Sequence, residues 1–128
     1  MKNKCIWCKE KEVKSMGNYF CCKEHYYKYQ YCENFLNWYY NPKESIKNNQ
    51  LRSYLETIYG HFCHRCKINK WNNKPIVFNV HHIDGNSLNN NLNNIIILCP
   101  NCHSLTNNYS YKNIGKGRYK TLKKKNEN

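Results

Sequence analysis

Four cysteines in the second half of the chain stand in two matching pairs. Cys63 and Cys66 form one Cys-x-x-Cys pair, and Cys99 and Cys102 form a second pair after 32 intervening residues. Two such pairs supply four thiolates, which is the ligand set of a closed, tetrahedral structural zinc site. The alternative is a pair of disulfides, which a reducing compartment disfavours. We therefore predict one Zn²⁺ ion bound by these four cysteines.

A second cluster of potential zinc ligands lies near the N-terminus. Cys5 and Cys8 form a third pair, and "FCCKEH" follows, with two adjacent cysteines and a histidine. The order Phe, Cys, three residues, ligand resembles the second knuckle of treble-clef zinc fingers, which favours the first of the two adjacent cysteines. We predict a second structural zinc ion, with Cys22 as a spare thiol, bound by Cys5, Cys8, Cys21 and His25.

The stretch "NVHHIDGN", residues 79–86, places two histidines side by side. In an extended segment successive side chains point to opposite faces, so His81 and His82 do not readily bind one ion together. Two neighbouring histidines on opposite faces are therefore expected to have two different roles at one site. The alternative is that these histidines pack inertly or enlarge the zinc site.

The segment between the two cysteine pairs resembles the HNH endonucleases, and the match covers about residues 60–115. The adjacent histidines close a first strand, Asn94 stands five residues before Cys99, and His103 directly follows Cys102 and opens a helix. The resemblance implies a small, zinc-stabilised α+β fold with a ββα-metal core, treble-clef-like, preceded by a zinc finger and helices. It also implies hydrolysis of DNA.

The same resemblance implies a role for each residue of the motif. His81 and His103 would bind a catalytic divalent ion, and His82 would be the general base that takes a proton from the attacking water. A neutral imidazole with a pKa of about 6.5 suits that role near pH 7. Asn94 would bond to the loop backbone and hold His82 in orientation.

The sequence departs from the family pattern in the composition of its metal site. Many relatives have Asp where His81 stands, and two imidazoles make a softer site. Mg²⁺ or Mn²⁺ is expected, with Ni²⁺ and Zn²⁺ as alternatives. Some relatives carry a further histidine where this chain has Asn107, so a third protein ligand is not expected. Asp84 is expected to be a turn residue.

Hydrophobic spacing and turn residues predict the elements that position these side chains. We expect a helix over 24–40, with Cys32 in the core, and a second helix that begins at Asn41-Pro42, with Glu44 completing its cap, and ends at Gly60. "WNNKP" predicts a turn and "PIVFNVHHI" a strand over 75–83. "NIIILC" predicts a second strand, although its apolar run alone fits a buried helix equally well. A helix of about ten residues is expected after Cys102, and a turn at 16–18.

Charge and length limit the classes of protein and partner. The 128 residues carry a net charge of +13, which seven thiolates and two Zn²⁺ ions would change to about +10. Such an excess is typical of a phosphate-binding surface, and because only three of the basic residues are Arg, it favours backbone attraction over base reading. No secretory leader or membrane span is evident, so we expect an intracellular protein, encoded by a phage or mobile element.

The predicted organisation is a zinc finger with an aromatic helix over 1–40, a connecting helix over 41–60, a nuclease domain over 61–115 and a basic tail over 116–128. The residues expected to attract DNA phosphates are Lys112, Lys116, Arg118 and Lys120. The leading hypothesis is a metal-dependent endonuclease that nicks or cuts duplex DNA, as a monomer, homodimer or part of a larger nucleoprotein complex. The alternative is a non-catalytic zinc-finger nucleic-acid-binding protein.

Overall fold

The computed structural model describes residues 3–13, 19–42 and 46–113, and the chain divides into two compact units, residues 1–40 and 41–128. The described part contains three α-helices and short antiparallel strands, which confirms the predicted α+β class. None of these helices is long and apolar enough to cross a bilayer. The turn predicted at 16–18 and the capping residue Glu44 lie outside the described residues.

The 1–40 unit consists of an irregular N-terminal segment and the helix α1 (Lys23–Tyr40), close to the helix predicted over 24–40. The N-terminal segment folds back on itself, since the N–H of Cys5 donates to the carbonyl of Lys11 at 2.9 Å. Trp38 is the buried residue of α1. Cys32 is exposed, so its prediction as a core residue was wrong. The physical reason is that α1 turns most of its surface to solvent.

In the 41–128 unit, α2 (Asn48–Tyr59) begins later than predicted. Asn41-Pro42 is not its start: Lys47 is the N-cap, and its carbonyl accepts the first helical hydrogen bonds from residues 50 and 51. The buried side chains of α2 are Leu51, Tyr54 and Leu55. Burial of these three side chains stabilises the helix, and its first buried residue lies only one turn after the N-cap. Its C-terminal end at Gly60 agrees with the prediction.

The single strand predicted over 75–83 is interrupted. Lys70–Trp71 (β1) and Lys74–Pro75 (β2) form a small antiparallel hairpin, while β3 covers only Asn79–His82. The turn residues Asn72 and Asn73 both have positive φ, 48° and 59°, which matches the two-residue turn that hairpins favour. Residues 74 and 75 therefore form antiparallel pairs with β1, the preceding strand, and are not part of β3.

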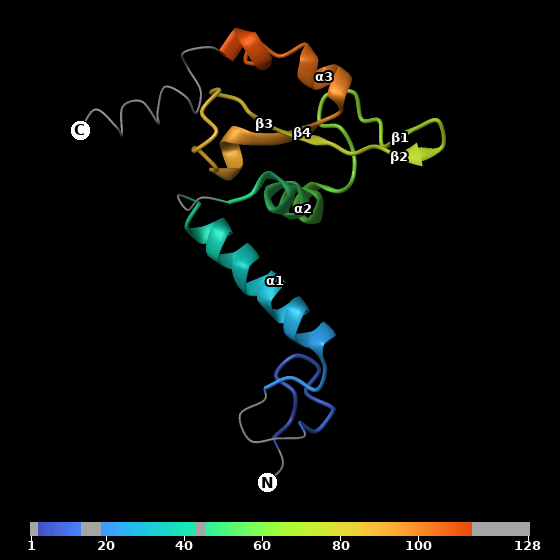
Figure 1. Ribbon diagram of the computed structural model, residues 1–128, viewed down its shortest axis with the longest axis vertical. Coiled ribbons are helices and arrows are strands. Elements are labelled where there is room, and N and C mark those ends of the chain that lie inside the picture. The colour runs from blue at the N-terminus through green and yellow to red at the C-terminus, as the bar shows by residue number, and fades with distance from the viewer. Residues whose placement is uncertain (1–2, 14–18, 43–45, 114–128) are drawn as a thin grey trace, which may run out of the picture. The chain divides into compact units, whose positions relative to one another are not determined.

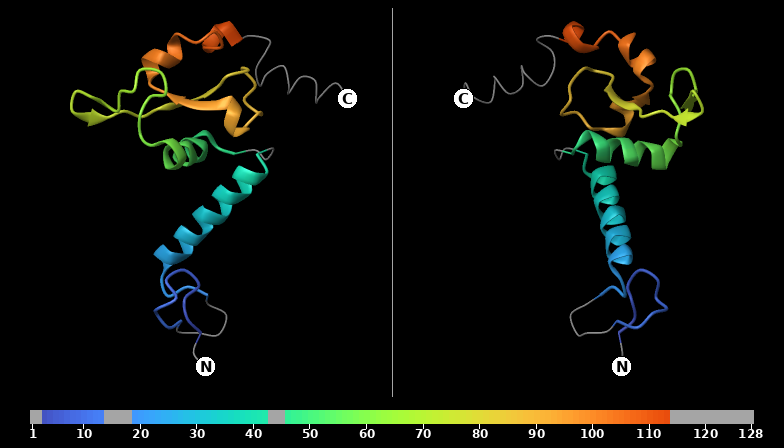
Figure 2. Two further views of the ribbon diagram at one scale, coloured as in Figure 1. Left: turned by 180° about the vertical axis from the view of Figure 1, so that it is seen from behind. Right: turned by 45° about the vertical axis from the view of Figure 1, so that its right-hand side comes forward.

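The centre of this unit is the antiparallel pair of β3 and β4 (Ile95–Leu98), with His82 opposite Ile95 and Asn79 opposite Leu98. In Figures 1 and 2, α2 lies against one face of this pair and α3 (Pro100–Ser104) lies on the other. The buried core of the unit includes Leu51, Leu55, Phe78, Ile95, Ile97 and Leu98. This arrangement is the ββα order that the sequence predicted.

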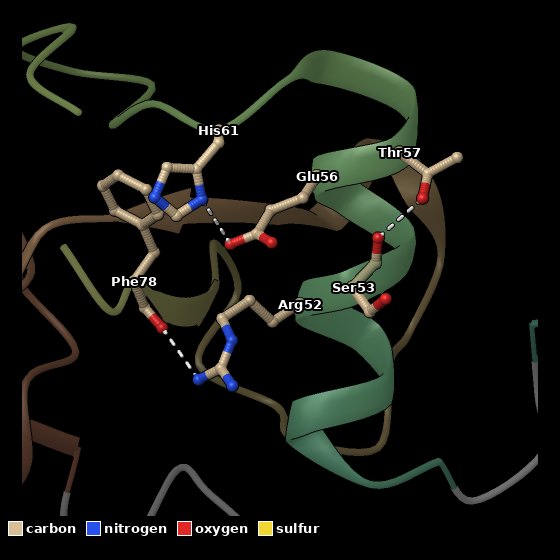
Figure 3. A network of polar contacts seen from close by, with 6 residues as sticks. All are labelled: Arg52, Ser53, Glu56, Thr57, His61 and Phe78. Atoms are coloured by element: carbon tan, nitrogen blue, oxygen red, sulfur yellow. Dashed lines mark hydrogen bonds and ion pairs between the residues drawn. The ribbon is translucent and has the colours of Figure 1, made fainter. Parts of the chain in front are cut away.

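Polar contacts attach α2 to the segment that leads into β3 (Figure 3). Arg52 donates from Nη1 to the carbonyl oxygen of Phe78, at 3.5 Å. Glu56 Oε1 lies 3.1 Å from Nδ1 of His61, whose ring packs edge-on against Phe78 with 4.7 Å between ring centroids. Since Phe78 directly precedes β3, these contacts fix where the strand begins.

The last helix is shorter than predicted and begins earlier. α3 spans Pro100–Ser104, so Cys102 lies inside it, and a separate 3₁₀ turn, η2, follows at Ser110–Asn113. The hydroxyl of Thr106 donates to the carbonyl of His103 at 2.8 Å, and its backbone N–H donates to the same oxygen at 3.1 Å. These bonds take the carbonyl that a longer helix would use, and the helix therefore ends.

Candidate active site and zinc sites

The four cysteines of the two later pairs come together in the 41–128 unit. Their sulfur atoms all lie within 4.8 Å of one another, and all nine cysteines of the chain are free thiols. The four residues are Cys63, Cys66, Cys99 and Cys102. Lys67, with φ 65°, donates its N–H to the carbonyl of Cys63 and so closes the first knuckle. The donor set fits a tetrahedral structural zinc ion.

The electrostatics of this cluster also favour a cation. Burial raises the pKa of the Cys63 thiol. Backbone hydrogen bonds from Cys66, Cys99 and Arg65 lower it by more than burial raises it, and the resulting pKa is about 6. Burial and the neighbouring thiols raise the pKa of Cys102 to about 12. One thiolate thus forms readily and opposes the ionisation of another. A bound Zn²⁺ would remove this conflict, because it stabilises every thiolate at once.

The N-terminal cluster contains Cys5, Cys8, Cys21 and His25, whose ligand atoms likewise lie within 4.8 Å of one another. His25 Nδ1 is 3.1 Å from Cys21 Sγ and 3.7 Å from Cys5 Sγ. Cys21 comes just before α1, and His25 lies in its first turn, so helix geometry brings these two ligands to the same side. Cys22 is exposed and outside the group.

The adjacent cysteines provide a matched pair of variants. Cys21→Ser is expected to lower the zinc content of the purified protein from two ions per chain to one, because it removes a ligand from a four-ligand site. Cys22→Ser is expected to keep both ions. Metal analysis by mass spectrometry measures the difference. Equal zinc contents in the two variants would contradict this assignment.

Two of the three histidines of the motif, His81 and His103, meet where α3 packs against β3. His81, which is 9% exposed, lies opposite Ile96 in the strand pair, and its ring centroid is 5.4 Å from that of His103 on α3. Tyr109 packs edge-on against the other side of His103, at 5.2 Å between centroids. A cleft of about 330 Å³ opens beside His81, and its lining residues are His64, Arg65, His81, Ile83, Ile96, Leu98 and Thr106, with neither His82 nor His103 among them.

The surroundings of these two imidazoles favour the neutral form. Burial lowers the pKa of His81, and the nearby His103, His82 and Arg65 lower it further. Burial also lowers the pKa of His103. A neutral imidazole has a free lone pair, which is what a metal ligand requires. The pair therefore fits two coordination positions of a divalent ion, and solvent and phosphate oxygens would have to supply the others.

Asp84 does not complete this ligand set. Its carboxylate accepts hydrogen bonds from the Asn86 N–H at 2.8 Å, the Asn89 side chain at 2.7 Å and the Asn94 side chain at 2.9 Å. Burial opposes ionisation, but these bonds hold the pKa of the carboxyl below its ordinary value. The carboxylate thus accepts hydrogen bonds from within its own loop, as expected for a turn residue.

Asn94 makes the loop contacts that the motif implies. Its Oδ1 accepts from the N–H of Asp84 at 3.1 Å, and its Nδ2 donates to the carbonyl of Asn89 at 2.8 Å. It is not, however, the direct partner of His82. Nε2 of His82 lies 2.9 Å from Oδ1 of Asn90. The sequence analysis missed Asn90, since nothing in "SLNNNLNN" distinguishes one asparagine from its neighbours.

Of the four residues expected to bind phosphate, Lys112 lies in the described part of the chain. Lys112 is exposed, and its Nζ donates to the carbonyl of Thr106 at 3.4 Å, so it lies near the end of α3. Lys116, Arg118 and Lys120 lie outside the described residues.

Comparison with known proteins gives one informative match. The H-N-H endonuclease F-TflIV of Escherichia phage T5 is 39% identical over 83 residues, which cover 65% of this chain. The aligned part is 34% of the phage protein, so the chain spans about a third of its relative. No family model and no solved structure matches the chain.

Proposed function

We propose that this chain, which is similar over 83 residues to an H-N-H endonuclease, is a metal-dependent enzyme that hydrolyses phosphodiester bonds in DNA. The observation that carries the proposal is that the imidazoles of His81 and His103 lie with their centroids 5.4 Å apart, and that His81 lines a cleft. Hydrolysis of a phosphodiester needs a deprotonated water and a cation at the developing charge. Of the two neighbouring histidines of β3, His82 would deprotonate the water and His81 would bind the cation.

In this proposal His82 removes the proton from the attacking water, and His81 and His103 hold the divalent ion. When bound, that ion would stabilise negative charge on the phosphate and leaving oxygen. His81 and His103 keep unprotonated nitrogens available because burial disfavours their charged forms. The softness of two nitrogen ligands favours Mn²⁺, Ni²⁺ or Zn²⁺ relative to Mg²⁺.

Arg65 is proposed to bind the phosphate that is cut. It lies between two cysteines of the zinc knuckle, lines the same cleft as His81, and has an exposed side chain. Its charge is close enough to His81 to lower the pKa of that imidazole. Since no carboxylate among the motif residues pairs with the metal site, a guanidinium there would face the phosphate without an acidic competitor.

The two cysteine clusters are proposed to be zinc-loaded and structural, and the substrate to be duplex DNA. Reduced thiolates in both clusters imply an intracellular location. The basic residues near the C-terminus would attract phosphates without regard to sequence. A single active site cuts one strand at a time, so a double-strand break would require a homodimer, a larger complex or two encounters.

The basic residues make a quantitative prediction about salt dependence. Four substitutions together are expected to reduce the slope of log Kd against log salt by about 3 to 4, since each lost phosphate contact removes about 0.9 from it. The substituted residues are Lys112, Lys116, Arg118 and Lys120, each changed to Ala. Fluorescence anisotropy of a labelled duplex at several salt concentrations measures the slope. An unchanged slope would mean that phosphate contacts come from elsewhere.

Supercoiled plasmid tests the proposed function directly. The zinc-loaded protein is incubated with plasmid in the presence of Mg²⁺, Mn²⁺, Ni²⁺ or added Zn²⁺, and the nicked and linear products are separated on a gel. We expect conversion that depends on the added ion. Binding of the plasmid without cleavage under every ion would favour the second candidate, a non-catalytic zinc-finger protein that binds nucleic acid. The high net positive charge supports both candidates.

A further inference from the structure

We propose that Asn90 is a positioning residue that fixes the tautomer of His82 and so selects the ring nitrogen that acts as the base. The inference deepens the proposed function and rests on it, because it gives His82 the role of base. Oδ1 of Asn90 lies 2.9 Å from Nε2 of His82. An amide oxygen only accepts hydrogen bonds, so Nε2 must carry the proton. Nδ1 is then the nitrogen with a free lone pair.

Asn90 makes this bond where water cannot replace it. The residue is 3% exposed, so solvent has little access to the bond. The tautomer with a proton on Nδ1 and none on Nε2 would place two acceptors, Nε2 and the Asn90 oxygen, 2.9 Å apart, where they repel each other. The bond therefore favours one tautomer.

The loop holds Asn90 through its neighbour. The backbone carbonyl of Asn89 accepts from Asn94, and the side chain of Asn89 donates to Asp84. Residue 89 is thus fixed by both its backbone and its side chain, which limits the positions that residue 90 can take. Asn94 therefore orients His82 indirectly: it holds Asn89, and the next residue, Asn90, contacts the imidazole.

The other end of the bond is equally well fixed. His82 is the last residue of β3 and stands opposite Ile95 in the strand pair. The next residue, Ile83, donates its N–H to the carbonyl of Asn94 at 2.8 Å. Both partners of the bond are therefore attached to the same strand pair and its connecting loop, and the imidazole ring keeps one orientation. Pre-organisation of this kind removes the need to order the base during the reaction.

The tautomer can be measured without DNA or cleavage. In the zinc-loaded full-length protein with ¹⁵N-labelled histidine, long-range ¹H–¹⁵N correlation distinguishes protonated from unprotonated ring nitrogens, and His82→Ala assigns the signals. We expect a protonated Nε2 and an unprotonated Nδ1. Asn90→Leu keeps the size of the side chain and removes the acceptor. It is expected to give averaged signals at both nitrogens and to lower kcat about 10- to 100-fold, with KM for plasmid unchanged.

Asn93→Leu is the matched control, since Asn93 lies in the same loop with an exposed side chain, and both readouts should stay at the wild-type values. An unprotonated Nε2 in the wild-type protein would overturn the proposal, as would an Asn90→Leu variant with unchanged signals and kcat. The wild-type spectrum decides even if Asn90→Leu does not fold. A protonated Nε2 in a wild-type protein that cleaves no plasmid under any divalent ion would support the effect of Asn90 on the tautomer and refute the proposed function.

Discussion

Replacement of Cys99 by Ser is expected to unfold the 41–128 unit. Cys99 is a member of the four-cysteine cluster, follows β4 directly, and is the N-cap of α3, where its sulfur accepts the N–H of Cys102. Binding of a structural zinc ion contributes about 10–16 kcal/mol in small zinc domains. A whole domain is commonly stable by only about 5–15 kcal/mol. The binding free energy lost with the zinc ion should therefore exceed the free energy of unfolding of the unit.

Cys32→Ser is the matched control for this variant. Cys32 is exposed on α1 and belongs to neither cluster, so the same chemical change should leave the zinc content and the melting curve as they are. Circular dichroism during heating and zinc analysis of the purified proteins measure both effects. A Cys99→Ser protein that keeps two zinc ions and melts with the wild type would contradict the structural role of the cluster.

The second large effect is expected from His82→Ala, which should lower the rate of plasmid cleavage about 10²- to 10⁴-fold, the range for loss of a general base. DNA affinity and zinc content should not change, because His82 is neither a zinc ligand nor part of the basic tail. Added imidazole is expected to restore part of the rate, since it can take the proton that the missing side chain took. Gel analysis of plasmid products over time gives the rates.

The outcome that refutes this role is cleavage by His82→Ala at the wild-type rate. A loss of DNA affinity equal to the loss of rate would also refute it, because His82 would then act in binding and not in chemistry. His81→Ala and His103→Ala should differ from His82→Ala in one respect. Higher concentrations of the divalent ion should partly restore their activity, since each variant still keeps one imidazole ligand.

The parts of the site that the sequence predicted depend on local chemistry. Two Cys-x-x-Cys pairs have few uses other than metal binding, and Cys21 was preferred to Cys22 because its place between Phe20 and His25 resembles a treble-clef knuckle. The order of β3, β4 and α3 followed from the resemblance to the HNH endonucleases, which rests on the histidine pair, Asn94 and His103. Each of these inferences needs only residues that are near one another in the sequence.

The parts that the sequence did not predict depend on hydrogen bonds that form only in the folded loop or turn. The role of Asn90 is set by a loop whose shape comes from side-chain bonds among Asp84, Asn89 and Asn94. The early end of α3 results from the hydroxyl of Thr106, which competes for a helical carbonyl. Neither effect leaves a periodic pattern in the sequence.

The three tryptophans are distributed so that each unit of the chain contains an intrinsic fluorophore. Trp71 in the β1–β2 hairpin is 64% exposed, whereas Trp38 on α1 is 1% exposed. Buried indoles emit at shorter wavelengths than hydrated ones and are shielded from dissolved quenchers such as iodide. In a Trp71→Phe protein the remaining tryptophan emission would come from Trp7 and Trp38. The melting of the first forty residues could then be followed by fluorescence, separately from that of the rest of the chain.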